Sequence, residues 1–287
     1  MIKAIRPGAQ FMLLSTLWFA LMNVSVKQIH HLPATQIILF RAAITLLFTG
    51  SQLYRLGIRP WGNNKKVLIL RGIFGTIALT AYFVTLKFLP LATAISLQYI
   101  SPIFTVLLSS WLLGEKLVKW QWPFFLLSFG GVLVLHWSSE ALSPAYLALG
   151  VGSALFSALA YTMIRKAAPT EHPSVVVFYF PLVAFPLILP WAWMDWVWPV
   201  GVDWIWLGLA GIFTQFAQMA MTKAFMAEKA AAISSLQYLG LVYGLGFGVL
   251  FFGESYDWSN IAGMLLIVGG VVANLFVYER AQRRKSS

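Results

Sequence analysis

The chain has 287 residues, of which 60% are hydrophobic and only 10% are charged. Soluble domains carry about a quarter charged residues, so this composition excludes a soluble protein. The net charge of +11 comes from 20 Lys and Arg against 9 Asp and Glu, and the absence of cysteine excludes disulfides, thiol chemistry and cysteine-based metal sites.

Ten apolar segments follow one another along the chain, each long enough to cross a bilayer core about 30 Å thick. Lys3 and Arg6 precede the first segment, but no small-residue cleavage site follows it, so we predict a helix there and not a signal peptide. The expected fold is an all-α integral membrane protein with spans at residues 9–28, 34–54, 67–87, 91–113, 120–137, 145–165, 174–194, 203–224, 230–252 and 259–278.

Several motifs occur twice with a constant spacing of 139 residues, since 235 − 96, 253 − 114 and 269 − 130 agree. We therefore expect a first five-helix repeat over residues 1–140 and a second over 141–287. Because five is an odd number, the second repeat should insert upside down relative to the first. The repeated motifs are Ser96-Leu97-Gln98-Tyr99 with Ser235-Leu236-Gln237-Tyr238, Gly114-Glu115 with Gly253-Glu254, Gly130-Gly131-Val132 with Gly269-Gly270-Val271, and Gly72-Ile73-Phe74 with Gly211-Ile212-Phe213.

The basic residues predict the orientation. If the N-terminus is cytoplasmic, 17 of the 20 Lys and Arg, Arg71 among them, lie on the cytoplasmic side. Lys27 and Lys87 are then outside, and Arg41 is the only full charge predicted within a span. This excess is the positive-inside pattern, which places both termini in the cytoplasm. It explains the net charge by topology and contact with anionic lipid, and not by nucleic-acid binding.

The duplicated signature resembles that of a known family. Leu112-Leu113-Gly114-Glu115 with Gly130-Gly131-Val132 ends the first unit, and Phe251-Phe252-Gly253-Glu254 with Gly269-Gly270-Val271 ends the second. These motifs are similar to those of the EamA-like transporters of the drug/metabolite transporter superfamily, over essentially the whole chain. Ser101-Pro102 matches the family's proline in span four, whereas the second half has Gly240-Leu241 there. The resemblance implies a multi-pass carrier of the inner (plasma) membrane.

The inverted duplication favours alternating access around a site near the bilayer midplane. We expect a secondary transporter of a small polar metabolite, an amino acid or a related zwitterion or anion, acting as an exporter or exchanger. The resemblance leaves open an uptake permease for S-adenosylmethionine or a vitamin such as riboflavin. A non-transporting membrane scaffold is the alternative of another class. Neither catalysis, a metal site nor a cofactor is expected, because no HExxH or nucleotide-binding P-loop occurs.

Polar residues within the spans are the candidates for contact with cargo, because polar groups in a membrane face the bundle interior or a wet cavity. The repeat-related Gln98 and Gln237 are the best candidates for a central site, although such residues also bridge helices. Arg41 could meet a substrate carboxylate or phosphate, or it could snorkel or bind carbonyls of a neighbouring helix. The predicted substrate path comprises Asn23, Arg41, Gln98, Tyr99, Ser101, Tyr161, Gln215, Gln218, Gln237 and Tyr238.

Carboxylates are found only at the ends of spans or between them. Glu115 and Glu254 could relay protons, but their position beside glycine at a span end favours an interfacial, helix-ending role. The lack of a mid-span acid argues against a site for sodium or a permanent cation. The Gly-Gly pairs of spans five and ten predict close helix packing, and these two spans could form a homodimer interface.

Overall fold

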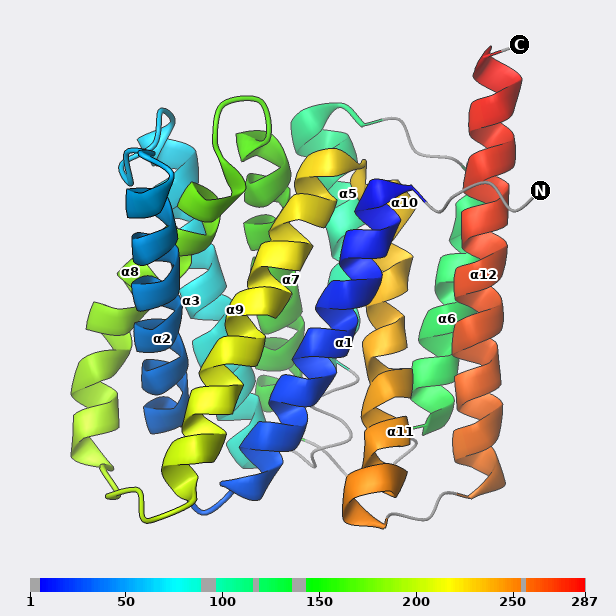
Figure 1. Ribbon diagram of the computed structural model, residues 1–287. Coiled ribbons are helices and arrows are strands. Elements are labelled where there is room, and N and C mark those ends of the chain that lie inside the picture. The colour runs from blue at the N-terminus through cyan, green and yellow to red at the C-terminus, as the bar shows by residue number, and fades with distance from the viewer. Residues whose placement is uncertain (1–5, 89–96, 116–118, 136–142, 254–256, 287) are drawn as a thin grey trace.

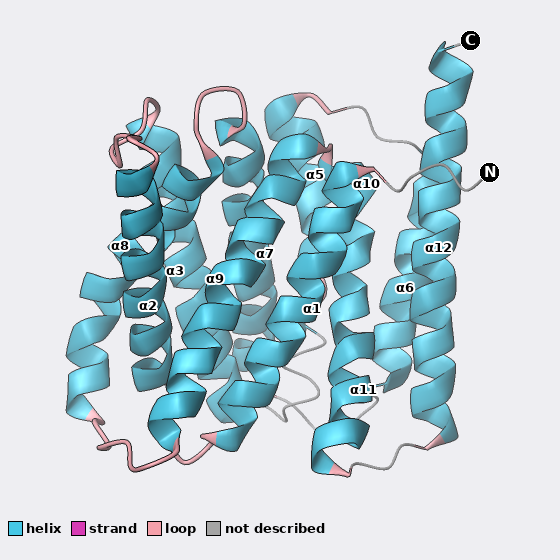
Figure 2. Cartoon of the chain, in the orientation of Figure 1, coloured by secondary structure: helices cyan, strands magenta, loops and turns pink. Residues whose placement is uncertain are grey.

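The computed structural model describes residues 6–88, 97–115, 119–135, 143–253 and 257–286, and every regular element among them is a helix (Figure 2). Within these ranges, seven segments are long and apolar enough to cross a membrane. The predicted all-α membrane fold is confirmed. The elements are α1 (Pro7–Gln28), α2 (Ala34–Arg55), α3 (Lys65–Phe88), α5 (Ser101–Leu113), η1 (Lys119–Gln121), α6 (Trp122–Leu135), α7 (Pro144–Ala167), α8 (Pro173–Met194), α9 (Asp203–Ala227), α10 (Ala230–Ile233), η2 (Ser234–Tyr238), α11 (Leu239–Phe252) and α12 (Trp258–Ser286).

The spacing of 139 residues extends beyond the repeated motifs to the helices themselves. Adding 139 to the bounds of α2, 34 and 55, gives 173 and 194, the bounds of α8. The helices α5 and α11 both end at a glycine in the left-handed conformation, Gly114 with φ 66° and Gly253 with φ 62°. A residue with a Cβ adopts this conformation at a cost, so both repeats end the helix by the same means.

The two repeats interlock along the length of the bundle. The most extensive contacts pair a helix of the first repeat with one of the second: α1 with α9, α3 with α7, α2 with α8 and α6 with α12 (Figure 1). Both termini lie at the same end of the bundle, at the top of Figure 1. The positive-inside pattern makes this the cytoplasmic end.

Two glycines related by the repeat allow two further close crossings, of α3 with α8 and of α9 with α2. A Cβ on Gly72 of α3 would lie 2.6 Å from the side chain of Val183 and 3.1 Å from the carbonyl oxygen of Tyr179, both on α8. A Cβ on Gly211 of α9 would overlap Ile44 of α2. Small residues let membrane helices approach through their backbones, so each repeat packs tightly onto helix two of the other.

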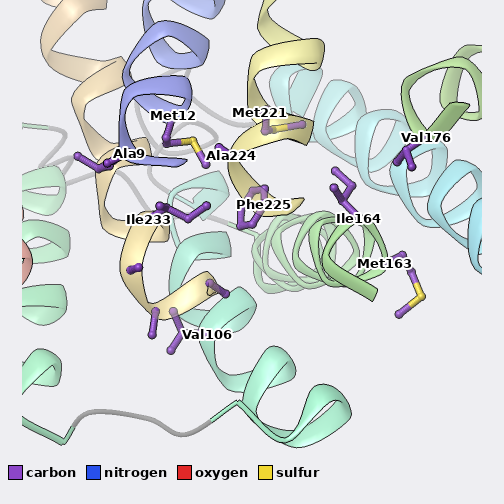
Figure 3. Close-up of a cluster of buried hydrophobic side chains, with 14 of the residues drawn as sticks. Ala9, Met12, Val106, Met163, Ile164, Val176, Met221, Ala224, Phe225 and Ile233 are labelled. Carbon is purple, nitrogen blue, oxygen red and sulfur yellow. The ribbon is translucent and has the colours of Figure 1, made fainter. Parts of the chain in front are cut away.

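An apolar cluster joins helices of both repeats (Figure 3). Met12 of α1, Phe225 of α9, Ile233 of α10 and Ile164 of α7 are all buried in it, and they come from both repeats. At the end of the bundle opposite the termini, the largest buried cluster of described residues has four members, among them Ile29.

Glu115 connects three spans at the cytoplasmic end. Its carboxylate accepts a hydrogen bond from Arg165 Nε at 2.6 Å and another from the backbone N–H of Ala230 at 3.0 Å. Arg165 also donates to the carbonyl oxygen of Met226 at 3.0 Å. Glu115 thus follows directly on the end of α5 and serves as a structural link between helices in the described part of the chain. Glu254 lies outside the described residues.

Replacing Glu115 with glutamine should lower the free energy of unfolding by about 1–3 kcal/mol, because Arg165 then keeps a mostly buried charge without its counter-ion. The matched control is Glu228→Gln, which breaks the more exposed pair with Arg6 and should cost about 0–1 kcal/mol. Thermal unfolding of the purified protein in detergent measures both. Equal losses would contradict the structural role of Glu115.

Candidate substrate-binding site

A small cavity lies between helices of both repeats. Its volume is about 10 Å³, roughly the space of one water molecule. Helices α2 and α3 of the first repeat and α8 and α9 of the second supply its walls. The polar lining residues are Arg41, Thr45, Thr214 and Gln218, and the apolar ones are Ile38, Ala42, Leu79, Phe180, Pro181 and Ala184.

Arg41 reaches this cavity from α2. It lies seven residues past Ala34, the outer end of the helix, or about 10 Å along the axis. Its Nε donates a hydrogen bond to the hydroxyl of Thr214 at 2.8 Å. Within the described residues this is its only hydrogen bond, so the terminal nitrogens Nη1 and Nη2 have no protein partner there. Arg41 is thus tied to a side chain of α9 and not to carbonyls of a neighbouring helix.

A second arginine, Arg71, lies inside the bundle, and the prediction that Arg41 is alone within a span is wrong. Arg71 had been grouped with the cytoplasmic basic residues. In the structure α3 begins at Lys65, so Arg71 lies about 9 Å into the helix, and only 3% of it is exposed. Its Nη2 donates to the amide oxygen of Gln218 at 3.2 Å. Its guanidinium lies 4.8 Å from the ring centroid of Phe180, a cation–π contact.

Glycine at position 75 makes room for this guanidinium. A Cβ on Gly75 would lie 2.5 Å from Nη1 of Arg71 and 2.9 Å from the ring of Phe180. Position 75 is one turn beyond Arg71 on α3, so the arginine folds along its own helix into space that a side chain would fill. The absence of a side chain at Gly75 therefore allows the Arg71 guanidinium to lie along α3 at this position.

Both arginines meet the same face of α9. Thr214 and Gln218 are four residues apart, so they lie on one side of the helix about 6 Å apart along its axis. Arg41 contacts the first and Arg71 the second. The two guanidinium groups therefore approach adjacent turns of α9 from two different helices of the first repeat.

Neither arginine has a carboxylate partner among the described residues. The ion pairs found there join Arg6 to Glu228, His31 to Asp203 and Arg165 to Glu115. All Asp and Glu of the sequence lie at the ends of spans or between them. An unpaired charge inside a membrane protein is costly and is typical of a binding site or transport pathway. The cavity is therefore electropositive and suited to an anion.

Three tyrosines extend the polar region towards the centre of the bundle. The rings of the repeat-related Tyr99 and Tyr238 are stacked with centroids 5.8 Å apart. Tyr161 interacts electrostatically with both Tyr99 and Arg71. The hydroxyl of Tyr238 is buried without a hydrogen-bond partner in the described part of the chain. The predicted residues Tyr99 and Tyr238 thus lie together, and Tyr161 is close enough to Tyr99 and Arg71 for an electrostatic interaction.

The repeated Ser-Leu-Gln-Tyr motif marks a break in span nine. This span consists of α10, the 3-10 turn η2 and α11, and residues 235–238 belong to η2. In span four the helix also stops at a turn at Tyr99 and restarts as α5 at Ser101. Discontinuous helices form the binding sites of many transporters built from inverted repeats. The motif therefore places its Gln and Tyr at the break in both halves.

The two repeat-related glutamines have different surroundings. The Gln98 amide donates to Ser157 Oγ at 2.7 Å and accepts from Ser153 Oγ at 3.0 Å, so it bridges to α7. The Nε2 of Gln237 is buried and has no hydrogen-bond partner among the described residues. The same is true of the amide oxygen of Gln215. The motif is symmetric, but its hydrogen bonding is not.

The remaining predicted residues differ in position. Ser101 is buried at the start of α5. Asn23 is exposed on α1 and forms no hydrogen bond within the part of the chain that the structure describes, so it is not brought together with the arginines. Sequence reasoning missed Arg71 and Thr214. The signal for Arg71 was the apolar run Val67–Leu70, which separates it from the interfacial Lys66 by more than a helical turn.

Comparisons with known proteins agree with this architecture. The model of the EamA-like transporter family matches residues 6–137 and 144–276. The pseudopaline exporter CntI of Pseudomonas aeruginosa is 32% identical over 272 residues, covering 94% of this chain and 96% of the exporter. A riboflavin transporter of Vibrio cholerae is 31% identical over 256 residues, covering 86% and 85%. One solved crystal structure superposes with a TM-score of 0.83 at 20% identity, covering 98% and 99%, which shows a shared fold.

Proposed function

Because the chain belongs to the EamA-like transporter family, we propose that it exports a small anionic or zwitterionic metabolite by alternating access. It is a transporter and not an enzyme, and a multi-pass protein of the plasma membrane. We propose its substrate class, its direction of transport and the residues that line its substrate path.

The observation that carries the proposal is the pair of arginines beside the cavity. Arg41 and Arg71 bring two positive charges into the bundle, and no carboxylate among the described residues neutralises them. An anionic group of the cargo would supply the missing partner. The unpartnered Gln237 amide and Tyr238 hydroxyl provide further hydrogen bonds, and the Tyr99–Tyr238 stack provides an apolar face.

The interlocked repeats support alternating access. Each of the main helix pairs joins one repeat to the other, so a tilt of one repeat against the other changes every crossing at once. The cavity has room for about one water molecule. Cargo entry therefore requires the walls formed by α2 and α9 to separate.

Export is favoured over uptake by the relative that is named a pseudopaline exporter. Uptake of a compound with a planar ring is the second candidate, because the stacked Tyr99 and Tyr238 suit a ring and another relative is named a riboflavin transporter. A homodimer through the outer faces of α6 and α12 is also part of the proposal, since these faces expose residues such as Leu133 and Phe276.

Counterflow in proteoliposomes tests this function. Liposomes are preloaded with one unlabelled compound, and uptake of the same labelled compound is followed for acidic and neutral amino acids, S-adenosylmethionine and riboflavin. Trapping of anionic or zwitterionic compounds supports the proposal, and trapping of riboflavin alone favours the second candidate. No trapping by protein that is shown to be folded favours the scaffold alternative.

The two glutamines should respond differently to alanine substitution. Gln237→Ala should raise the KM of transport about tenfold with little change in Tm, because its Nε2 has no hydrogen-bond partner among the described residues and can donate to cargo. Gln98→Ala should instead lower stability by about 1–2 kcal/mol, since it leaves Ser153 and Ser157 without this amide. Transport kinetics and thermal unfolding of both variants check this, and identical behaviour of the two would contradict it.

A further inference from the structure

The register of α9 sets the spacing between the side chains that anchor Arg41 and Arg71. Arg41 is anchored at Thr214 and Arg71 at Gln218, positions separated by one helical turn or about 6 Å. Both hydrogen bonds are made to neutral side chains, so the anchors hold the guanidinium groups in place without neutralising them. Arg41 lines the cavity and Arg71 contacts two of its lining residues, Gln218 and Phe180, so the two cationic groups are anchored one helical turn apart on α9.

Each guanidinium keeps donors available for a ligand. Arg41 uses only Nε within the described residues, which leaves the planar pair Nη1 and Nη2. Arg71 is 3% exposed, and its Nε is buried without a hydrogen-bond partner in the described part of the chain. The guanidinium group matches a carboxylate through two parallel hydrogen bonds. One carboxylate can satisfy one arginine in this way but leaves the other charged and unpaired.

One part of the cavity wall is apolar. Ala42, Leu79 and Ala184 line the cavity there together with the ring of Phe180, which lies under the Arg71 guanidinium. Such a surface suits a short hydrocarbon segment, while Thr45 adds a hydroxyl group to the lining. The complementary ligand has negative groups at its two ends and methylene groups between them.

We infer that the cargo carries two carboxylate groups, one bound by Arg71 and the other by Arg41, across a short apolar spacer. This inference rests on the proposed function and narrows its substrate class. Arg71, which is almost fully buried and lies near Tyr161, binds the carboxylate that all substrates share. Arg41, which is only partly buried, selects for the second carboxylate.

Binding to the purified full-length protein in detergent tests the inference without requiring transport. The probes are pairs that differ in one carboxylate: glutamate with glutamine, aspartate with asparagine, and glutarate with butyrate. Ligand-induced shifts of Tm give apparent affinities. The dicarboxylate of each pair should bind at least tenfold more tightly, the effect of one charge-assisted contact.

Arg41→Gln should reduce this preference to less than threefold. The matched control is Arg55→Gln, an exposed arginine in the last turn of the same helix, which should leave the preference unchanged. Equal affinities within the pairs, a preference that persists in Arg41→Gln, or no binding by any probe would each overturn the inference. Selective binding without counterflow would overturn the proposed function and not the two-carboxylate site.

Discussion

Replacing Arg71 with glutamine is expected to lower the rate of transport at least a hundredfold at subsaturating substrate. The variant removes the charge that faces the cargo, and a buried anion without its partner costs about 3–5 kcal/mol. Every 1.4 kcal/mol corresponds to a factor of ten, so a loss of about two to three and a half orders of magnitude follows. Glutamine can still bond to Gln218 and should keep the helices together.

Initial rates of counterflow in proteoliposomes measure this effect, with Tm as the check on folding. Lys66→Gln is the matched control, because it removes a positive charge from the exposed cytoplasmic end of the same helix. Arg71→Lys should rescue transport only partly, since an ammonium group lacks the planar pair of donors. Transport within threefold of wild type in Arg71→Gln would exclude Arg71 from the binding site.

Leucine at Gly131 or Gly270 is expected to destabilise the protein by about 3 kcal/mol or more, the upper range for overpacking a tight core. These glycines are related by the repeat and lie where α6 crosses α12. A Cβ on Gly131 would lie 2.7 Å from the carbonyl oxygen of Gly263, and one on Gly270 would lie 2.9 Å from that of Phe124 and overlap Ser128. Backbone atoms cannot yield as a flexible side chain can, so the helices must separate.

The neighbouring glycines provide an internal control. A Cβ on Gly130 or Gly269 would meet nothing within 4 Å, so leucine at these positions should leave stability within about 0.5 kcal/mol. Thermal unfolding in detergent and the yield of monodisperse protein compare the four variants. If leucine at Gly130 is as harmful as at Gly131, the close crossing of α6 and α12 is wrong.

The membrane spans could be predicted from sequence because a bilayer requires long apolar helices. The span predicted at 34–54 corresponds to α2 at 34–55, and the one at 174–194 to α8 at 173–194. The irregularity inside span nine was not predicted. Its apolar composition is continuous, and only the polar Ser-Leu-Gln-Tyr motif indicates where the helix breaks.

The candidate site was predicted less completely, because it depends on depth and on neighbours. Arg71 follows Lys65 and Lys66 closely in sequence. Because α3 begins at Lys65, however, Arg71 lies more than one turn into the helix and is buried in the bundle. The glutamines of the repeated motif looked equivalent. They differ because Gln98 meets Ser153 and Ser157 of α7, whereas the repeat-related positions of α1 are Leu14 and Trp18, which cannot bond to an amide in the same way.

The central claim is that this chain carries an anionic metabolite through a site that contains Arg71. Counterflow by wild type and Arg71→Gln, side by side in liposomes preloaded with unlabelled glutamate, tests it most directly. Wild type should concentrate the labelled glutamate transiently above its equilibrium level, and the variant should not. A simple approach to equilibrium without overshoot would indicate a channel. Identical overshoot by both proteins would contradict the role of Arg71, and no uptake by either would contradict glutamate as cargo.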